Sequence, residues 1–235
     1  MALRKVLGLS GLLVAAAVGS GQAADIASDS ASVSARAAEA RQPASVPAPS
    51  LFSPKPYATD PDWGVFVFGG ASAGRANLLE LIPMPWVGDY ADNYFVGGAV
   101  ERRLGRVYQH FIFEVEAGAG YRFKEVNAPE VWAALYLRFD GFPWNHIVYT
   151  TAAINTGLSY ATKVSAVEKD AGADAGNPNG SNLLHYLGPE LTFADPNNRN
   201  TELVIRWHHR SGVYGLFNGV HGGSNVVTGG IRQRF

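Results

Sequence analysis

The sequence lacks cysteine, an excess of charge of either sign and any long apolar run. Without cysteine the chain can form neither a disulfide nor a cysteine-ligated metal site. Its formal net charge of −1 gives no indication of a nucleic-acid partner. No apolar run reaches the ~18 residues that a transmembrane helix requires, so this chain can lie in a membrane only as a closed barrel. We expect no metal and no cofactor.

The N-terminal residues 1–23 have the pattern of a secretory signal peptide. Arg4 and Lys5 give the basic start, residues 6–18 are apolar, and Gly21-Gln22-Ala23 is a small-residue cleavage site. The apolar part falls in the ~7–15 residue range of a signal peptide and is too short to span a bilayer. The mature protein is therefore expected to begin near Ala24, outside the cytoplasm.

Residues 24–62 are rich in alanine, serine and proline and show no sustained period. Such a segment buries too little apolar surface to offset the entropy lost on ordering. We predict a disordered periplasmic leader over this range, followed by a single domain over residues 63–235.

That domain can be divided into eight extended segments. With 27 glycines and 11% aromatic residues, the composition suits an all-β protein. Each segment is long enough to supply the roughly 9–11 residues that a tilted membrane strand needs to cross the hydrocarbon. The predicted strands are residues 63–73, 93–104, 107–123, 130–140, 146–162, 183–193, 201–211 and 225–235.

Several of these segments alternate with period two between an apolar and a polar face. In residues 201–211, Leu203, Ile205 and Trp207 alternate with Glu202, Val204 and Arg206. This pattern predicts an eight-stranded antiparallel transmembrane β-barrel with apolar residues facing lipid. The polar face would place these charged residues inside: Glu114, Glu116, Glu190, Glu202, Arg122, Arg206, Arg210, Arg232 and Arg234. Because an eight-stranded barrel is filled by its own side chains, we expect a paired charge network rather than a pore.

The connections between the predicted strands alternate in length. Short links are expected at residues 105–106, 141–145 and 194–200. Long links are expected at residues 74–92, 163–182 and 212–224. The link at residues 124–129 lies at the same end of the barrel as the long links but is short. Outer-membrane barrels keep short turns in the periplasm and long loops outside. This orientation places His209 and Ser211 at the outer end of the seventh strand, in the leaflet that holds lipopolysaccharide.

His209 and Ser211 form the one plausible catalytic pair. The two residues are two positions apart on a strand, so they point to the same side and lie about 7 Å apart along its axis. Local bending could bring the imidazole and the hydroxyl together as base and nucleophile. On spacing alone, a polar pair tolerated at the lipid headgroup level explains them equally well.

In a barrel of this size, His209-Arg210-Ser211 ends the penultimate strand, a loop rich in glycine and asparagine follows, and the last strand closes on Phe235. On these features the chain resembles the bacterial lipid A 3-O-deacylase family. In that family the histidine and serine of this motif are the base and nucleophile of an esterase on the barrel's outer wall. A carboxylate early in the last strand orients the histidine. The resemblance implies that His209 is the base and Ser211 the nucleophile, and that lipid A is the partner.

The sequence departs from the family at two positions. No acidic residue lies between Ser211 and Phe235. Asn225 can instead hydrogen-bond the imidazole, as the asparagine of Cys-His-Asn proteases does. Gly212 replaces the asparagine that helps form the family's oxyanion hole, and its backbone N–H is the expected donor there.

The sequence therefore predicts a lipid A 3-O-deacylase of the outer membrane. One alternative is a non-catalytic structural barrel, and another is an acyltransferase that uses the same pair with a phospholipid donor. His208 is expected in the lumen beside Arg206 as a structural residue. His185 and His221 are placed near the outer rim, with no spacing that supports metal ligation.

Overall fold

The computed structural model describes residues 52–53, 61–74, 77–90, 92–173 and 177–235. The predicted signal peptide and most of the predicted leader lie outside these residues. The described residues include no helix that is long and apolar enough to cross a membrane.

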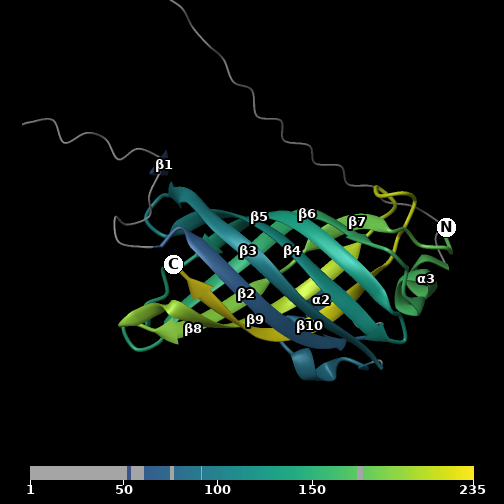
Figure 1. Cartoon of the computed structure of the whole chain (residues 1–235), viewed down its shortest axis with the longest axis horizontal. Helices are drawn as coiled ribbons and strands as arrows, with labels where there is room; N and C mark the ends of the chain where they lie inside the picture. The colour runs from purple at the N-terminus through teal and green to yellow at the C-terminus, as the bar shows by residue number, and fades with distance from the viewer. Residues whose placement is uncertain (1–51, 54–60, 75–76, 91, 174–176) are drawn as a thin grey trace, which may run out of the picture. The chain divides into compact units, whose positions relative to one another are not determined.

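One antiparallel sheet contains every strand of the described residues. The strands are β1 (Phe52–Ser53), β2 (Trp63–Ser72), β3 (Asn93–Val107), β4 (Phe111–Lys124), β5 (Ala128–Phe139), β6 (Tyr149–Ala161), β7 (Leu183–Leu187), β8 (Glu190–Asp195), β9 (Asn198–Ser211) and β10 (Gly223–Arg234). From β2 onward each strand pairs with the next, except that β7 and β8 both lie between β6 and β9, and β10 pairs with β2, which closes the sheet into a ring (Figure 1). The two-residue β1 pairs with the end of β3. The predicted all-β barrel is confirmed.

The expected link at residues 105–106 is wrong. β3 runs on through both residues to Val107, and the turn follows at residues 108–110. A register shift between Arg103 and Gly105 adds a bulge that lets β3 continue past its glycine. Tyr108 then takes the left-handed conformation, with φ of 55°, that turns the chain into β4. The link after β5 is also longer than expected, spanning residues 140–148.

The sixth predicted strand is interrupted at Gly188 and Pro189. β7 and β8 both pair with β6 and β9, and the residue partners continue across the break without a shift, so the two strands make one crossing of the barrel. Proline has no N–H to donate to the ladder, which explains the gap. The carbonyl of Pro189 still accepts from the Trp207 N–H at 3.0 Å.

The two faces of the strands lie as the alternation predicts. On β9, Leu203 is 56% exposed on the outside, whereas its neighbours Glu202 and Val204 are fully buried. The outward apolar residues form a belt around the wall, which includes Val67, Val96, Val131, Leu135, Ile154, Leu203 and Ile231. An apolar exterior around a charged interior is the reverse of a water-soluble sandwich and is typical of a barrel that crosses a membrane.

Inside the ring, arginine and glutamate side chains form an ion-pair network around Arg206 and Arg232, and a smaller cluster of Arg122, Glu130, Arg210 and Glu168 lies at the loop end. The Arg206 guanidinium lies 2.7 Å from Glu116 and 2.6 Å from Glu190. Arg232 bridges Glu190, at 2.8 Å, to Glu202, at 2.7 Å. The described residues bury eight arginines and seven glutamates, and Asp140 pairs with the eighth arginine at the turn end of the barrel. Charge is therefore nearly balanced inside, and the predicted paired network is confirmed.

A layer of aromatic rings lies between this network and the loop end of the barrel. The His208 ring stacks on Phe95 at a centroid distance of 4.8 Å and meets Trp132 edge-on at 5.1 Å. The neighbouring strand β4 makes room for the Trp132 indole at Gly118, because a Cβ at that position would overlap the ring. Rings and ion pairs together fill the lumen.

Neutralising Glu190 should destabilise the barrel strongly. In Glu190→Gln, Arg138, Arg206 and Arg232 would lose a shared carboxylate and stay buried, so we expect the unfolding free energy to fall by about 3–5 kcal/mol. Urea titration of the refolded protein in lipid vesicles measures it. The matched control is Asp92→Asn, which breaks an exposed pair with Lys124 and should change the same quantity by less than about 1 kcal/mol. Equal effects from the two variants would show that the network is not a stability determinant.

Candidate functional site on the outer wall

The candidate site lies where β9 and β10 meet the long loops. The same end of the barrel carries the loops after β2, β4, β6 and β9, and also α3 (Ala166–Ala173), opposite the end at which the chain terminates (Figure 1). His209 and Ser211 stand on the outer face of β9, partly exposed, whereas His208 and Arg210 between and beside them are fully buried inside.

Asn225 orients the His209 ring. The two residues are partners across the β9–β10 ladder, and His209 Nδ1 lies 2.7 Å from Asn225 Oδ1. Because an amide oxygen only accepts hydrogen bonds, Nδ1 carries the proton and donates it. The neutral ring is thereby held in the tautomer whose Nε2 is free to accept a proton.

Ser211 shares this face but is not hydrogen-bonded to the base. Among the described residues, no hydrogen bond joins its hydroxyl to His209. Its strand partners are Gly223 on β10 and His185 on β7. His185 Nε2 lies 2.8 Å from the Thr156 hydroxyl. The sequence places His185 near the rim without a role; only the β7–β9 register shows that it lies opposite Ser211.

These side chains line a cavity of 670 Å³ on the outside of the barrel. One side is formed by β7, β9 and β10, and the rest by the start of the loop after β2, by α3 and by the loop after β9. His185, His209, Ser211 and Asn225 are its polar wall residues, and Asp170 of α3 is the one carboxylate among its described lining residues. Leu78 and Leu187 contribute apolar surface. The cavity therefore combines a nucleophile, imidazoles and an apolar wall.

The backbone N–H of Gly212, the expected oxyanion donor, is engaged within the loop after β9. It donates to the Gly222 carbonyl at 3.0 Å, so it is not available to an oxyanion in this conformation. A Cβ at this position would overlap the Val220 carbonyl, so only glycine fits the close approach between the two sides of the loop. Packing accounts for the glycine.

The other histidines differ in position. His208 is fully buried in the lumen, with Nε2 2.7 Å from Glu130, which confirms its predicted structural place. His221 is exposed and lines the cavity. Within the described part of the chain, no three His, Asp or Glu side chains are grouped so that they could hold a metal ion.

Glu168 is a buried residue at this end of the barrel that the alternation of strands did not reveal. It projects from α3 into the mouth of the barrel, where its Oε1 accepts from Arg210, at 2.9 Å, and from the Ser224 hydroxyl, at 2.7 Å. These bonds fasten α3 over the ends of β9 and β10, one rung beyond the His209–Asn225 pair. Sequence reasoning missed Glu168 because it lies in a loop helix, outside the period-two pattern.

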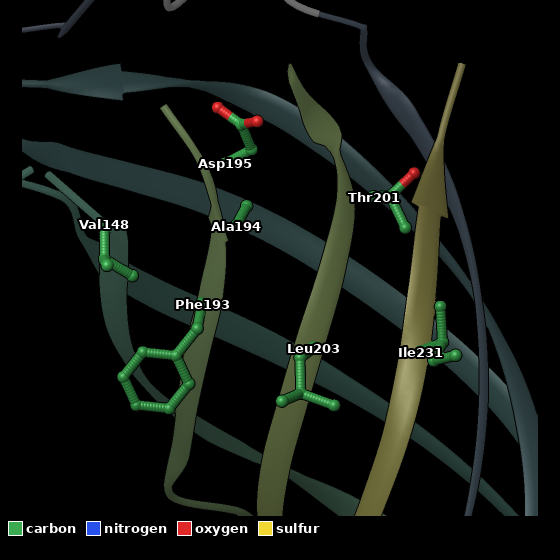
Figure 2. A pocket seen from close by; sticks show the side chains of 7 residues that line it. All are labelled: Val148, Phe193, Ala194, Asp195, Thr201, Leu203 and Ile231. Carbon is green, nitrogen blue, oxygen red and sulfur yellow. The ribbon is translucent and has the colours of Figure 1, made fainter. Parts of the chain in front are cut away.

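A second hollow, of 390 Å³, lies on the same wall toward the opposite end. Figure 2 shows Phe193, Leu203 and Ile231 of three adjacent strands beside one another in it, with Asp195 and Thr201 at its edge. Its lining contains no imidazole within the described residues. It is a dip in the apolar belt of the barrel.

Comparison with known proteins finds no matching family model and no matching curated protein. Solved structures of similar fold include Neisserial surface protein A, at 14% identity and a TM-score of 0.44, covering 74% of this chain and 97% of that one. A de novo designed transmembrane β-barrel matches at 11% identity and a TM-score of 0.42, covering 75% of this chain and 98% of that one.

The class of the protein follows from its own features. The sheet closes on itself, the interior is charged and filled, and the belt is apolar. The protein is a transmembrane β-barrel of the outer-membrane type. Its polar cavity lies on the lipid-facing side of the wall.

The His209 tautomer can be tested directly. We expect ¹⁵N-histidine spectra in micelles, at mildly alkaline pH, to show His209 protonated on Nδ1 and bare on Nε2. Asn225→Ala should shift the signal toward the tautomer mixture of free imidazole, because the fixed acceptor is lost. His209→Gln assigns the resonance. A wild-type ring protonated on Nε2 would contradict the arrangement.

Proposed function

We propose that the protein is a lipid A 3-O-deacylase, a serine esterase of the outer membrane. Ser211 is the nucleophile, His209 the base and Asn225 the residue that orients the base. The observation that carries the proposal is the 2.7 Å bond between His209 and Asn225 on the outer wall, beside Ser211. A polar pair held there faces lipid, where polar groups without a function are disfavoured.

The chemistry proceeds through an acyl-enzyme. The Ser211 hydroxyl attacks the ester carbonyl of the 3-linked acyl chain, and its proton passes to His209 Nε2. The imidazolium returns that proton to the departing sugar hydroxyl as the ester C–O bond breaks. Water, deprotonated by the same imidazole, then hydrolyses the acyl-serine and releases the fatty acid. A side-chain rotation within the cavity brings the serine hydroxyl to the base.

The position of the cavity favours a lipid substrate. It opens on the outside of the barrel, at the end that carries the long loops, and Leu78 and Leu187 extend it toward the apolar belt. An acyl chain can thus approach from the membrane while the sugar stays at the headgroup level. The packed lumen offers no comparable route, because its side chains fill it.

Two features set the strength of the catalytic machinery. Asn225 fixes the tautomer but carries no charge, so it stabilises the imidazolium less than a carboxylate would. Gly212 can serve as oxyanion donor only when its bond to Gly222 opens. Both features lower the expected rate relative to a site with the family's carboxylate.

A non-catalytic structural barrel is the second candidate. The observation that favours it is that no hydrogen bond joins Ser211 to His209 among the described residues, while the interior is tightly ion-paired. In that case His209 and Ser211 are headgroup-level polar residues, and the protein stabilises the membrane or presents its loops.

Substitution of the pair distinguishes the two functions. Ser211→Ala and His209→Ala should each lower deacylation by about 10²–10⁴-fold, the range of general acid–base contributions. The double variant should be little worse than either, since the two residues act as a unit. Asn225→Ala should lose less, and Asn225→Glu should gain activity by supplying a charge beside the imidazolium. Mass spectrometry of lipid A from cells expressing each variant measures the released chain.

His185→Gln is the matched imidazole control, because it removes a ring from the same cavity. It should retain most of the activity if His209 is the base. Heat-modifiable migration in gels shows that each variant is folded. If neither the wild type nor Asn225→Glu alters lipid A, the structural barrel is the correct function.

A further inference from the structure

The loop after β2 folds against the outside of the barrel. Its residues 77–90, here called the wall-docked segment, contain α2 (Leu78–Leu81) and η2 (Pro85–Val87). Leu78 and Leu81 pack on Trp207, an outward residue of β9 that is only 3% exposed as a result. Outward residues of β9 and of the neighbouring strands pack against the same cluster: Leu187, Leu191, Ile205 and Val227.

Short helical turns pair half of the backbone N–H groups of this segment internally. Within it, six N–H groups donate to partners inside the segment: those of Leu79, Glu80, Leu81, Ile82, Met84 and Val87. Pro83 and Pro85 have no N–H at all. The Leu81 carbonyl accepts from the Trp207 indole at 2.9 Å, and the Pro85 carbonyl accepts from the Tyr90 hydroxyl. Backbone that enters lipid must be satisfied in this way, whereas a loop in water has no such need.

The face turned away from the barrel is apolar and exposed. Leu79 and Trp86 are 76% and 74% exposed, and Met84 and Val87 are beside them in sequence and also exposed. The wall on which the segment lies continues into the apolar belt, where Val67 is 59% exposed. The same surroundings must therefore cover both the belt and this exposed face of the segment.

The depth of the segment follows from its anchor and its charge. Trp207 lies four residues before Ser211, about 13 Å along the strand. The segment contains two charged residues, Glu80 on α2 and Asp89 next to its end at Tyr90. A carboxylate is disfavoured at the bilayer centre and tolerated at the headgroup level. The segment fits the boundary between headgroups and acyl chains, where Trp and Tyr also concentrate.

We propose that the wall-docked segment is inserted into the lipid bilayer, with Leu79, Met84, Trp86 and Val87 among the acyl chains of the outer leaflet. It thereby forms the membrane-facing rim of the cavity that contains His209. This inference rests on packing and backbone pairing and not on catalysis, so an inactive protein would leave it intact.

Spin labelling tests the insertion, and the absence of cysteine makes each label unique. The full mature chain, refolded into vesicles of phosphatidylcholine and phosphatidylglycerol, carries a nitroxide at Leu79→Cys or Trp86→Cys. Val67→Cys gives the lipid reference, and Asn127→Cys, in the exposed loop at the same end, gives the water reference. Oxygen collides more with labels in lipid, and a neutral nickel chelate collides more with labels in water.

We expect the oxygen-to-nickel collision ratio at positions 79 and 86 to exceed that at position 127 several-fold and to approach, from below, that at position 67, which lies about four residues deeper in the belt than the level of Trp207. A ratio equal to that at position 127 would place the segment in water and overturn the proposal. Dipolar broadening that grows with the protein-to-lipid ratio would overturn it in favour of contact with a second copy.

The Trp207 anchor has its own test. Trp207→Phe keeps a ring of similar kind but removes the donor to the Leu81 carbonyl. With the label at position 86, we expect a several-fold faster nitroxide motion. Trp144→Phe, which removes an indole bond to Thr150 far from the segment, should leave the motion unchanged. Identical spectra for the wild type and Trp207→Phe would overturn the role of Trp207 as the anchor.

Discussion

The pairing of charges inside the barrel is the constraint on which the rest of the molecule depends. Arg206 and Arg232 each contact carboxylates from several strands, so the network ties residues 90 or more positions apart in sequence. Such pairs are not strongly stabilising against apolar packing, yet losing one partner leaves a buried charge, which is costly. The ring must therefore close in one register for the charges to be satisfied. A lumen filled in this way leaves the outer wall and the loops as the surfaces available for function.

On that wall, two features meet at successive outward positions of β9. Trp207 is covered by the wall-docked segment, and His209, the next outward residue, lies in the cavity at the segment's edge. On the inward side, Arg210 holds Glu168 of α3 over the barrel mouth. The same short stretch of β9 thus holds three features: the wall-docked segment on the outer wall, α3 over the barrel mouth, and the oriented imidazole of His209. Rigid support on both sides suits a site that has to keep its geometry at a membrane surface.

The sequence was sufficient to assign the inward and outward faces of the strands, but not to show which residues of different strands and loops meet. A period of two assigns Glu202 to the inside and Leu203 to the outside without further information. It cannot show that His185 lies opposite Ser211, because that depends on the register between β7 and β9, which is set by closure of the whole ring. Glu168 was missed because it comes from a loop helix. The sequence also does not show that the Gly212 N–H pairs with the Gly222 carbonyl, a contact within an irregular loop.

The neutral residue at position 225 is consistent with the surroundings of the site. Asn225 is 7% exposed, and its backbone carbonyl accepts from the Ala73 N–H at 2.9 Å, at the neck of the loop that bears the wall-docked segment. A carboxylate here would be a desolvated charge whenever His209 is neutral, and it would be compensated only during proton transfer. An amide avoids that standing penalty and still fixes the tautomer, at the expense of imidazolium stabilisation. An uncharged orienting residue therefore suits a largely buried position beside the segment that forms the membrane-facing rim of the cavity.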